Sequence, residues 1–156
     1  MRLARYSACV DAVQFRADFS ALPDRLRRRP YRHGMLDRAV CERFLTAPYP
    51  AAHDFWLCYQ EGRALGGISA NVSASHPDTG CFGLLEFDTD ACKAGEMLLA
   101  AACDWLSVQG VTRVIGPMAF NTWFPYRFRL PDSEPHRPFL MVSPVLATEV
   151  GSPTMQ

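Results

Sequence analysis

The central part of the chain contains an apolar run, a helical pattern and a second apolar run, in that order. Cys81–Phe87 is apolar apart from Glu86 and is long enough for one buried strand. Over Ala91–Gln109 the apolar residues recur at the spacing of an amphipathic helix. Val111–Ile115 has the pattern of a second strand. A strand, helix and strand in this order predict parallel pairing, with the helix as the crossover connection.

Both ends of this helix carry residues suited to helix termini. The side chains of Asp88–Asp90 can accept hydrogen bonds from the first free N–H groups, and Gly110 can adopt the left-handed conformation that ends many helices. The apolar positions between them are Ala94, Leu98, Ala101, Ala102, Trp105 and Val108, of which we expect Leu98, Ala102 and Trp105 to be buried.

A β-hairpin is predicted before the central strand. Asp54–Gln60 alternates, Glu61-Gly62 forms a tight turn, and Leu65–Ser73 returns. The alternation places Phe55, Leu57 and Tyr59 on one face, with Trp56 and Cys58 on the other. We expect this hairpin to lie antiparallel to Cys81–Phe87, and Gly66-Gly67 to allow close approach of a neighbouring segment.

The N-terminal pattern predicts a first strand within Leu3–Phe15 and a helix over Asp18–Arg29. Pro23 is best tolerated in the first turn of a helix, which favours Asp18 or Ser20 as its cap. A second helix is predicted over Leu36–Leu45 from apolar residues four positions apart.

Composition and charge fit one globular domain. The chain has 156 residues, of which 49% are hydrophobic, and its formal net charge is zero. The basic run Arg25–Arg29 could bind phosphate, but a solvated helix end is the better interpretation, because the whole chain is neutral. We therefore expect no nucleic-acid partner. There is no signal peptide pattern and no apolar run of membrane-spanning length, so we expect a cytoplasmic protein with no membrane contact.

Cysteine and histidine positions indicate neither disulfides nor a metal site. The cysteines are scattered, without a C-x-x-C pair: Cys9, Cys41, Cys58, Cys81, Cys92 and Cys103. We expect reduced, mostly buried thiols. His33, His53 and His136 share no ligand spacing with one another or with the cysteines, so no metal is predicted.

The stretch from about Asp54 to Val142 resembles a GNAT (GCN5-related N-acetyltransferase) domain. It is most similar to an uncharacterised bacterial branch with a Gly-Pro-Met motif, here Gly116-Pro117-Met118, followed by Asn121-Thr122-Trp123 and Tyr126-Arg127-Phe128. The resemblance implies an α/β (α+β) fold, with a mixed, mostly antiparallel sheet flanked by helices. Residues 1–145 would form this domain, and residues 146–156 a disordered tail.

The resemblance also implies that the domain is incomplete at its C-terminal end. A complete GNAT domain continues with a further helix and two more strands, which cover the edge of the strand matched by Val111–Ile115. With that edge uncovered, unpaired backbone groups and the aromatic residues of Trp123–Phe128 would face outward. We therefore expect a homodimer, or a complex with a partner protein, that uses Val111–Phe128, with the short predicted strand Phe139–Val142 as a further candidate segment.

The donor implied by the resemblance is acetyl-CoA or another acyl-CoA. The family's diphosphate-binding loop has the form Arg/Gln-x-x-Gly-x-Gly/Ala-x-x-Leu. Its backbone N–H groups hold the diphosphate at the start of a helix. With its last position on Leu98, Gly95 matches the second glycine. However, Lys93 replaces the first glycine and Asp90 replaces the Arg/Gln. The implied donor-binding residues are Leu85, Phe87, Lys93, Ala94 and Gly95.

Two functions follow from these residues. In the first, the chain is an acyl-CoA-dependent N-acyltransferase acting on a small amine or amino-acid-type acceptor. The resemblance implies Glu86 as the general base, although an edge-facing or salt-bridged glutamate fits the sequence equally well, and Trp123, Tyr126 and Arg127 would line the acceptor pocket. In the second, the chain is a non-catalytic GNAT-derived module that binds a partner through its incomplete sheet edge. The departures at Asp90 and Lys93 favour the second function, and the strand–helix–strand pattern favours the first.

Overall fold

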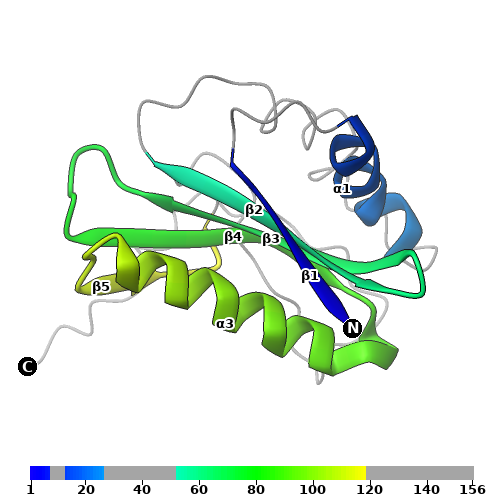
Figure 1. Cartoon of the computed structure of the whole chain (residues 1–156). Coiled ribbons are helices and arrows are strands. Elements are labelled where there is room, and N and C mark those ends of the chain that lie inside the picture. Colours follow the sequence, from blue (N-terminus) through cyan, green and yellow to red (C-terminus); the bar gives the residue numbers. More distant parts are fainter. Residues whose placement is uncertain (8–12, 27–51, 119–156) are drawn as a thin grey trace, which may run out of the picture.

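The computed structural model describes residues 1–7, 13–26 and 52–118 of the chain. In these ranges five strands form one sheet in the order β1-β2-β3-β4-β5 (Figure 1). The strands are β1 (Arg2–Ser7), β2 (His53–Gln60), β3 (Arg63–Val72), β4 (Thr79–Phe87) and β5 (Arg113–Ile115). Neighbouring strands from β1 to β4 are antiparallel, and β5 is parallel to β4. The mixed, mostly antiparallel sheet predicted from the sequence is confirmed.

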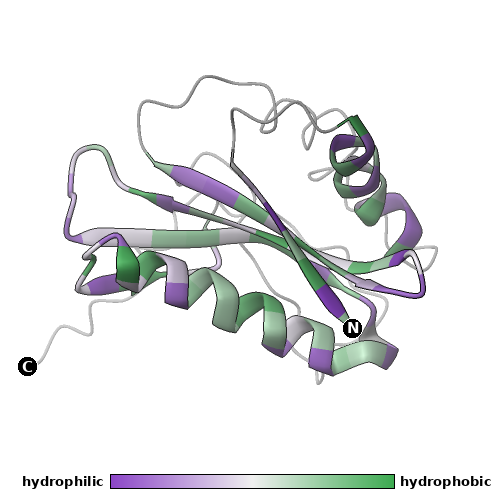
Figure 2. Ribbon diagram, viewed as in Figure 1, coloured by the Kyte–Doolittle hydropathy of each residue, from purple (hydrophilic) through white to green (hydrophobic). Residues whose placement is uncertain are grey.

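Helices cover both faces of this sheet. Helix α1 (Val13–Leu26) packs on one face and α3 (Cys92–Val108) on the other (Figure 1). Figure 2 shows that hydrophilic residues gather near strand ends and turns, whereas the middle of the sheet is apolar. No helix in the described ranges is long and apolar enough to cross a membrane.

The β2–β3 hairpin confirms the alternation read from the sequence. Phe55 and Leu57 belong to the cluster under α1, whereas Trp56 and Cys58 belong to the cluster under α3. The turn at Glu61-Gly62 has φ angles of 52° and 77°, as the tight turns favoured in hairpins require.

Close packing explains the glycine pair in β3. A Cβ added to Gly67 would lie 2.8 Å from Leu22 Cδ1 and 3.0 Å from Phe19 Cε2, both on α1. A Cβ on Gly66 would lie 2.6 Å from the Glu86 carbonyl oxygen. Side chains at these positions would therefore displace α1 from the sheet and β4 from β3. The glycine pair thus allows the close approach that the sequence predicted.

Helix α1 begins five residues earlier than predicted, and both expected caps were wrong. Asp18 lies inside the helix, where its carboxylate accepts hydrogen bonds from Tyr59 Oη at 2.8 Å and from Gln14 Nε2 at 3.1 Å. Ser20 is buried and donates to the Arg16 carbonyl at 2.7 Å. Pro23 lies toward the C-terminal end of the helix rather than in its first turn. The helix start was predicted wrongly because proline was expected only in the first turn of a helix.

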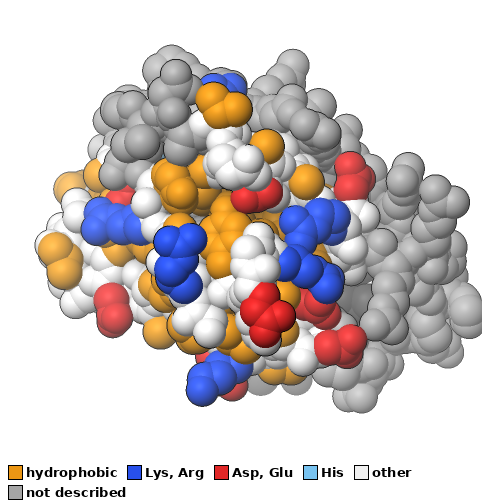
Figure 3. Space-filling model, turned by 45° about the vertical axis from the view of Figure 1, so that its right-hand side comes forward, with side chains coloured by type: hydrophobic (Ala, Val, Ile, Leu, Met, Phe, Trp, Pro, Cys, Tyr) orange, Lys and Arg blue, Asp and Glu red, His pale blue; other side chains and the backbone are white. Residues whose placement is uncertain are grey.

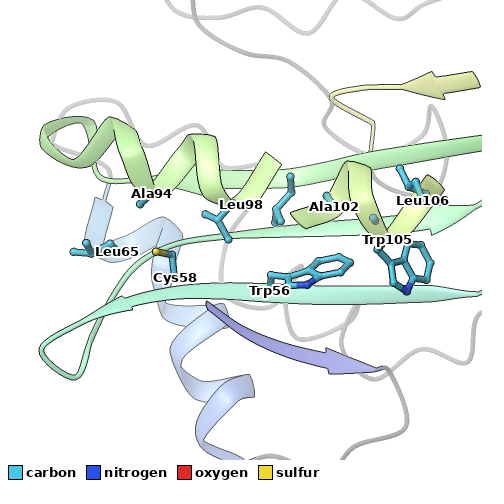
Figure 4. Packing of buried hydrophobic residues seen from close by; sticks show 10 residues of the cluster. Trp56, Cys58, Leu65, Ala94, Leu98, Ala102, Trp105 and Leu106 are labelled. Carbon is cyan, nitrogen blue, oxygen red and sulfur yellow. The ribbon is translucent and has the colours of Figure 1, made fainter. Parts of the chain in front are cut away.

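Helix α3 closely matches its prediction. Figure 4 shows side chains of α3 directed at the strands, with Trp105 beside Trp56; the two rings meet edge to face at 5.9 Å between centroids. Leu98 and Ala102 are fully buried and Trp105 is 7% exposed. Gly110 follows the helix with a φ of 81°. Val108 was expected on the apolar stripe but is 83% exposed, and Leu106 is buried in the same turn instead.

Candidate functional site

The site predicted from the sequence lies along the C-terminal half of β4, which contains a β-bulge. In the pairing with β3, Gly83 lies opposite Ser69 and Glu86 lies opposite Gly67. Three steps along β4 therefore match two along β3. Leu84, inside this interval, has a φ of 50°, which is uncommon for a residue with a branched side chain. The extra residue reverses the facing of every residue that follows it.

Strand β5 pairs with only the first part of β4. Thr79–Cys81 pair with Arg113–Ile115, and the Met118 N–H then donates to the Phe82 carbonyl at 2.6 Å. Beyond Phe82, no described residue pairs with β4 on its β5 side. The two parallel strands therefore part just before the bulge at Leu84.

Glu86 lies on the face of the sheet that carries α1. It is directly opposite Gly67, whose missing side chain would point at Phe19 and Leu22, and directly paired residues of neighbouring strands share a face. The Glu86 side chain is partly buried. This position places Glu86 on the same face as Phe19 and Leu22 of α1.

The residues on either side of Glu86 lie on the opposite face. Leu85 packs against the core under α3. Phe87 also faces α3: a Cβ built on Gly95 would come within 2.9–3.0 Å of its ring atoms. Close contact between helix and strand therefore accounts for the glycine at position 95. Ala94 is buried beside it in the same core.

The Asp88 carboxylate caps the turn between β4 and α3. A short 3₁₀ helix, η1 (Thr89–Ala91), precedes α3. The Asp88 carboxylate accepts the Asp90 N–H at 3.2 Å, and the Asp88 carbonyl accepts the Ala91 N–H at 2.8 Å. Arg63 forms an ion pair with the Asp88 carboxylate at 3.3 Å. The prediction that an aspartate caps this end is confirmed, although the helix it caps is η1.

Lys93 is exposed in the first turn of α3 and lines an open hollow of about 620 Å³. The hollow is lined by Met1, Gln60, Glu61, Lys93 and Met97. It adjoins the β2–β3 turn, so Lys93 lies with Glu61 rather than with the bulge of β4.

Three residues next to the site have pKa values shifted mainly by burial. Burial, and next the hydrogen bond to Asp18, raise the pKa of Tyr59 far above its ordinary value. Burial also raises the pKa of the thiols of Cys58 and Cys81. Both thiols are therefore protonated at neutral pH.

Several predicted elements and residues lie outside the described ranges. They are the acceptor-pocket residues Trp123, Tyr126 and Arg127, the helix Leu36–Leu45, the strand Phe139–Val142 and the tail over residues 146–156. The described ranges contain no cluster of three potential metal ligands. The sequence reading missed the bulge at Leu84 and the hydrogen bond between Met118 and Phe82. For the hydrogen bond between Met118 and Phe82, the only signal in the sequence was the Gly-Pro-Met motif, which contains Met118.

No protein-family model matches the chain, and no curated protein matches it in sequence. Its fold matches those of solved N-acetyltransferases. Ribosomal-protein-alanine N-acetyltransferase from Brucella melitensis biovar Abortus 2308 has a TM-score of 0.51 and 13% identity, covering 73% of this chain and 77% of the other. An aminoglycoside acetyltransferase from an uncultured soil metagenomic sample, in complex with sisomicin, has a TM-score of 0.51 and 14% identity, over 76% and 77%.

A third match is AAC(6')-Iy in complex with the bisubstrate analogue CoA-S-monomethyl-acetylneamine. It has a TM-score of 0.51 and 12% identity, over 76% of this chain and 81% of the other. At these identities the likeness concerns the fold. The chain has the fold of GNAT N-acetyltransferases, as the resemblance in its sequence implied.

Proposed function

We propose that the chain is an N-acyltransferase that transfers an acyl group from an acyl-CoA to a small amine or amino-acid-type acceptor. The observation that carries this proposal is the bulge of β4 where β5 parts from it, with Glu86 beside it. The matched structures add support, because one contains a CoA-based bisubstrate analogue and another an aminoglycoside. Action in the cytoplasm, with acetyl-CoA as donor, belongs to the same proposal.

The proposed site fits the thioester arm of the donor better than its diphosphate. An extended chain with amide groups can pair with the backbone of β4 beyond Phe82, with Leu85 and Phe87 on the α3 side of that strand. Lys93, Ala94 and Gly95 would lie at the far end of the donor. There, however, the Asp90 N–H is already bonded to a carboxylate, and a second carboxylate is adjacent.

In the reaction, the acceptor nitrogen attacks the thioester carbonyl carbon, the C–S bond breaks, and an amide and a free thiol form. Glu86 takes the proton that the nitrogen loses, and the leaving thiolate takes a proton from water. Backbone N–H groups of β4 stabilise the negative charge that develops on the carbonyl oxygen. Trp123, Tyr126 and Arg127 are proposed to contact the acceptor from the part of the chain beyond the described ranges.

Calorimetry with acetyl-CoA and longer acyl-CoAs tests the first step. We expect saturable binding of at least one acyl-CoA, followed by amine-dependent thiol release when a panel of amino acids and aminoglycosides is supplied. Absence of binding to every acyl-CoA would refute the proposal.

A second candidate function is a non-catalytic module that binds a partner chain, or a second copy of itself, through the β5 edge. Val114 and Ile115 on this strand are 42% and 39% exposed, which leaves apolar surface at the edge. Light scattering across a range of concentrations distinguishes the two candidates when combined with calorimetry. A dimer that binds no acyl-CoA supports the module, whereas a monomer that binds acyl-CoA supports the enzyme.

A further inference from the structure

The start of α3 has the wrong charge for a diphosphate. The stretch from Asp88 to Glu96 carries three carboxylates and a single lysine. A bound diphosphate would bring further negative charge next to the carboxylates of Asp88 and Asp90. Arg63 lies near this turn, but its guanidinium is already paired with the Asp88 carboxylate at 3.3 Å.

The hydrogen-bond donors at this end are also partly occupied. Phosphate groups bind at helix starts because free backbone N–H groups point at them. Here the Asp88 carboxylate and carbonyl accept the N–H groups of Asp90 and Ala91. The Asp88 carboxylate therefore occupies a donor of η1 that a phosphate oxygen could otherwise use, whereas α3 itself begins without a side-chain cap.

The two remaining features of the loop are explained without a phosphate. Gly95, the position that matches the family pattern, is in close contact with the Phe87 ring, where any side chain would clash. Lys93 faces the hollow that Glu61 also lines. Neither residue gives a reason to expect strong attraction for an anion. Figure 3 shows acidic and basic side chains interspersed over the face it presents, without a large expanse of basic charge.

We infer that this chain recognises its donor by the pantetheine thioester arm, and that the phosphate-bearing end of the donor contributes little to affinity. This inference rests on the proposed function, and it specifies which part of the donor that function requires. The ligand class is a pantetheine thioester, held along β4 where β5 parts from it.

Calorimetry with acetyl-CoA, S-acetylpantetheine and adenosine 3′,5′-diphosphate tests the inference. We expect the two thioesters to bind with Kd values that agree within about threefold, with little change between low and high salt, because exposed charge pairs are screened by salt. We expect no binding of adenosine 3′,5′-diphosphate. If acetyl-CoA binds more than about tenfold more tightly and its affinity falls with salt, the inference is overturned while the proposed function stands. If neither thioester binds, the proposed function itself fails.

Two exposed substitutions sharpen this test. Asp90→Arg leaves the Asp88 cap in place and should change acetyl-CoA binding by less than about twofold, because a solvent-exposed charge contributes little, without changing S-acetylpantetheine binding. Lys93→Glu should change the Kd of either thioester by less than about twofold, because a solvent-exposed charge pair contributes little. A selective loss of acetyl-CoA binding in Lys93→Glu would mean that this lysine holds the diphosphate, which overturns the inference. A tightening of acetyl-CoA binding by about tenfold or more in Asp90→Arg would show that the phosphate-bearing end contributes to affinity at this loop, which also overturns the inference.

Discussion

Replacing Gly95 with alanine should have opposite effects on stability in the natural chain and in a Phe87→Ala variant. Gly95 lies inside α3, where alanine is favoured over glycine by about 1 kcal/mol per residue. In the natural chain, however, the new Cβ would lie 2.9–3.0 Å from three atoms of the Phe87 ring. Overpacking of this kind costs about 1–3 kcal/mol. Gly95→Ala should therefore leave stability unchanged or lower it by up to about 2 kcal/mol.

Removing the ring should reverse the sign. In a Phe87→Ala background the same Gly95→Ala substitution no longer meets the ring. It should then raise stability by about 0.5–1 kcal/mol through helix propensity alone. Urea denaturation of all four proteins, followed by far-UV circular dichroism, measures both differences as one double-mutant cycle. Phe87→Ala is less stable by itself, so only the effect of alanine at position 95 within each background counts.

A stabilisation of similar size in both backgrounds would contradict this reasoning. It would mean that the Phe87 ring does not restrict position 95, and that another requirement, such as close approach of a ligand, selects glycine there. The cycle therefore also tests whether packing accounts for the one position that matches the diphosphate pattern of the family.

Three further predictions concern other parts of the fold. Tyr59→Phe should destabilise the chain by about 1 kcal/mol near neutral pH, because it removes the hydrogen bond to Asp18. Because the pKa of Tyr59 is raised in the folded state, the difference from the natural chain should shrink as the pH rises above 10.0, and urea titrations at pH 8 to 11 measure it. Leu98→Ala should cost about 2–5 kcal/mol, because Leu98 is fully buried; thermal denaturation measures the loss, and a change below about 1 kcal/mol would contradict this packing. Glu86→Gln should keep acyl-CoA affinity within about twofold but lower amine-dependent thiol release by about 10²- to 10⁴-fold if Glu86 is the general base, so an unchanged rate would assign it a structural role.

The fold was largely predictable because its signals are local and repeated. Alternation in Asp54–Gln60 and helical spacing over Ala91–Gln109 each involve many positions, so one misleading residue changes little. Helix α1 shows the opposite case. Its buried residues Phe15, Phe19 and Leu22 have helical spacing. The predicted start of the helix, however, depended on the single residue Pro23. A proline near the end of a helix is stable here because tertiary packing buries it.

The candidate site was predictable only in part, because its key feature leaves little trace in the sequence. The bulge lies at Leu84, between residues paired with Ser69 and Gly67. Leu84 and Leu85 are identical in type, and each packs into an apolar core on a different face. A run of leucines is equally compatible with either facing, so the amino-acid pattern cannot locate the extra residue. The capping interactions of Asp88, by contrast, follow from residue type and position.

The bulge determines what Glu86 can do. With regular alternation from Gly83 onward, Glu86 would point toward α3, and Phe87 would point toward α1. One additional residue at Leu84 exchanges them, so that Phe87 packs on Gly95 and the Glu86 carboxylate lies on the α1 face, opposite Gly67. An acid held against the α3 core would be buried at a high cost in desolvation. On the α1 face it lies opposite Gly67, on the strand with which a thioester is proposed to pair. The same irregularity thus places the only carboxylate within that strand on the α1 face.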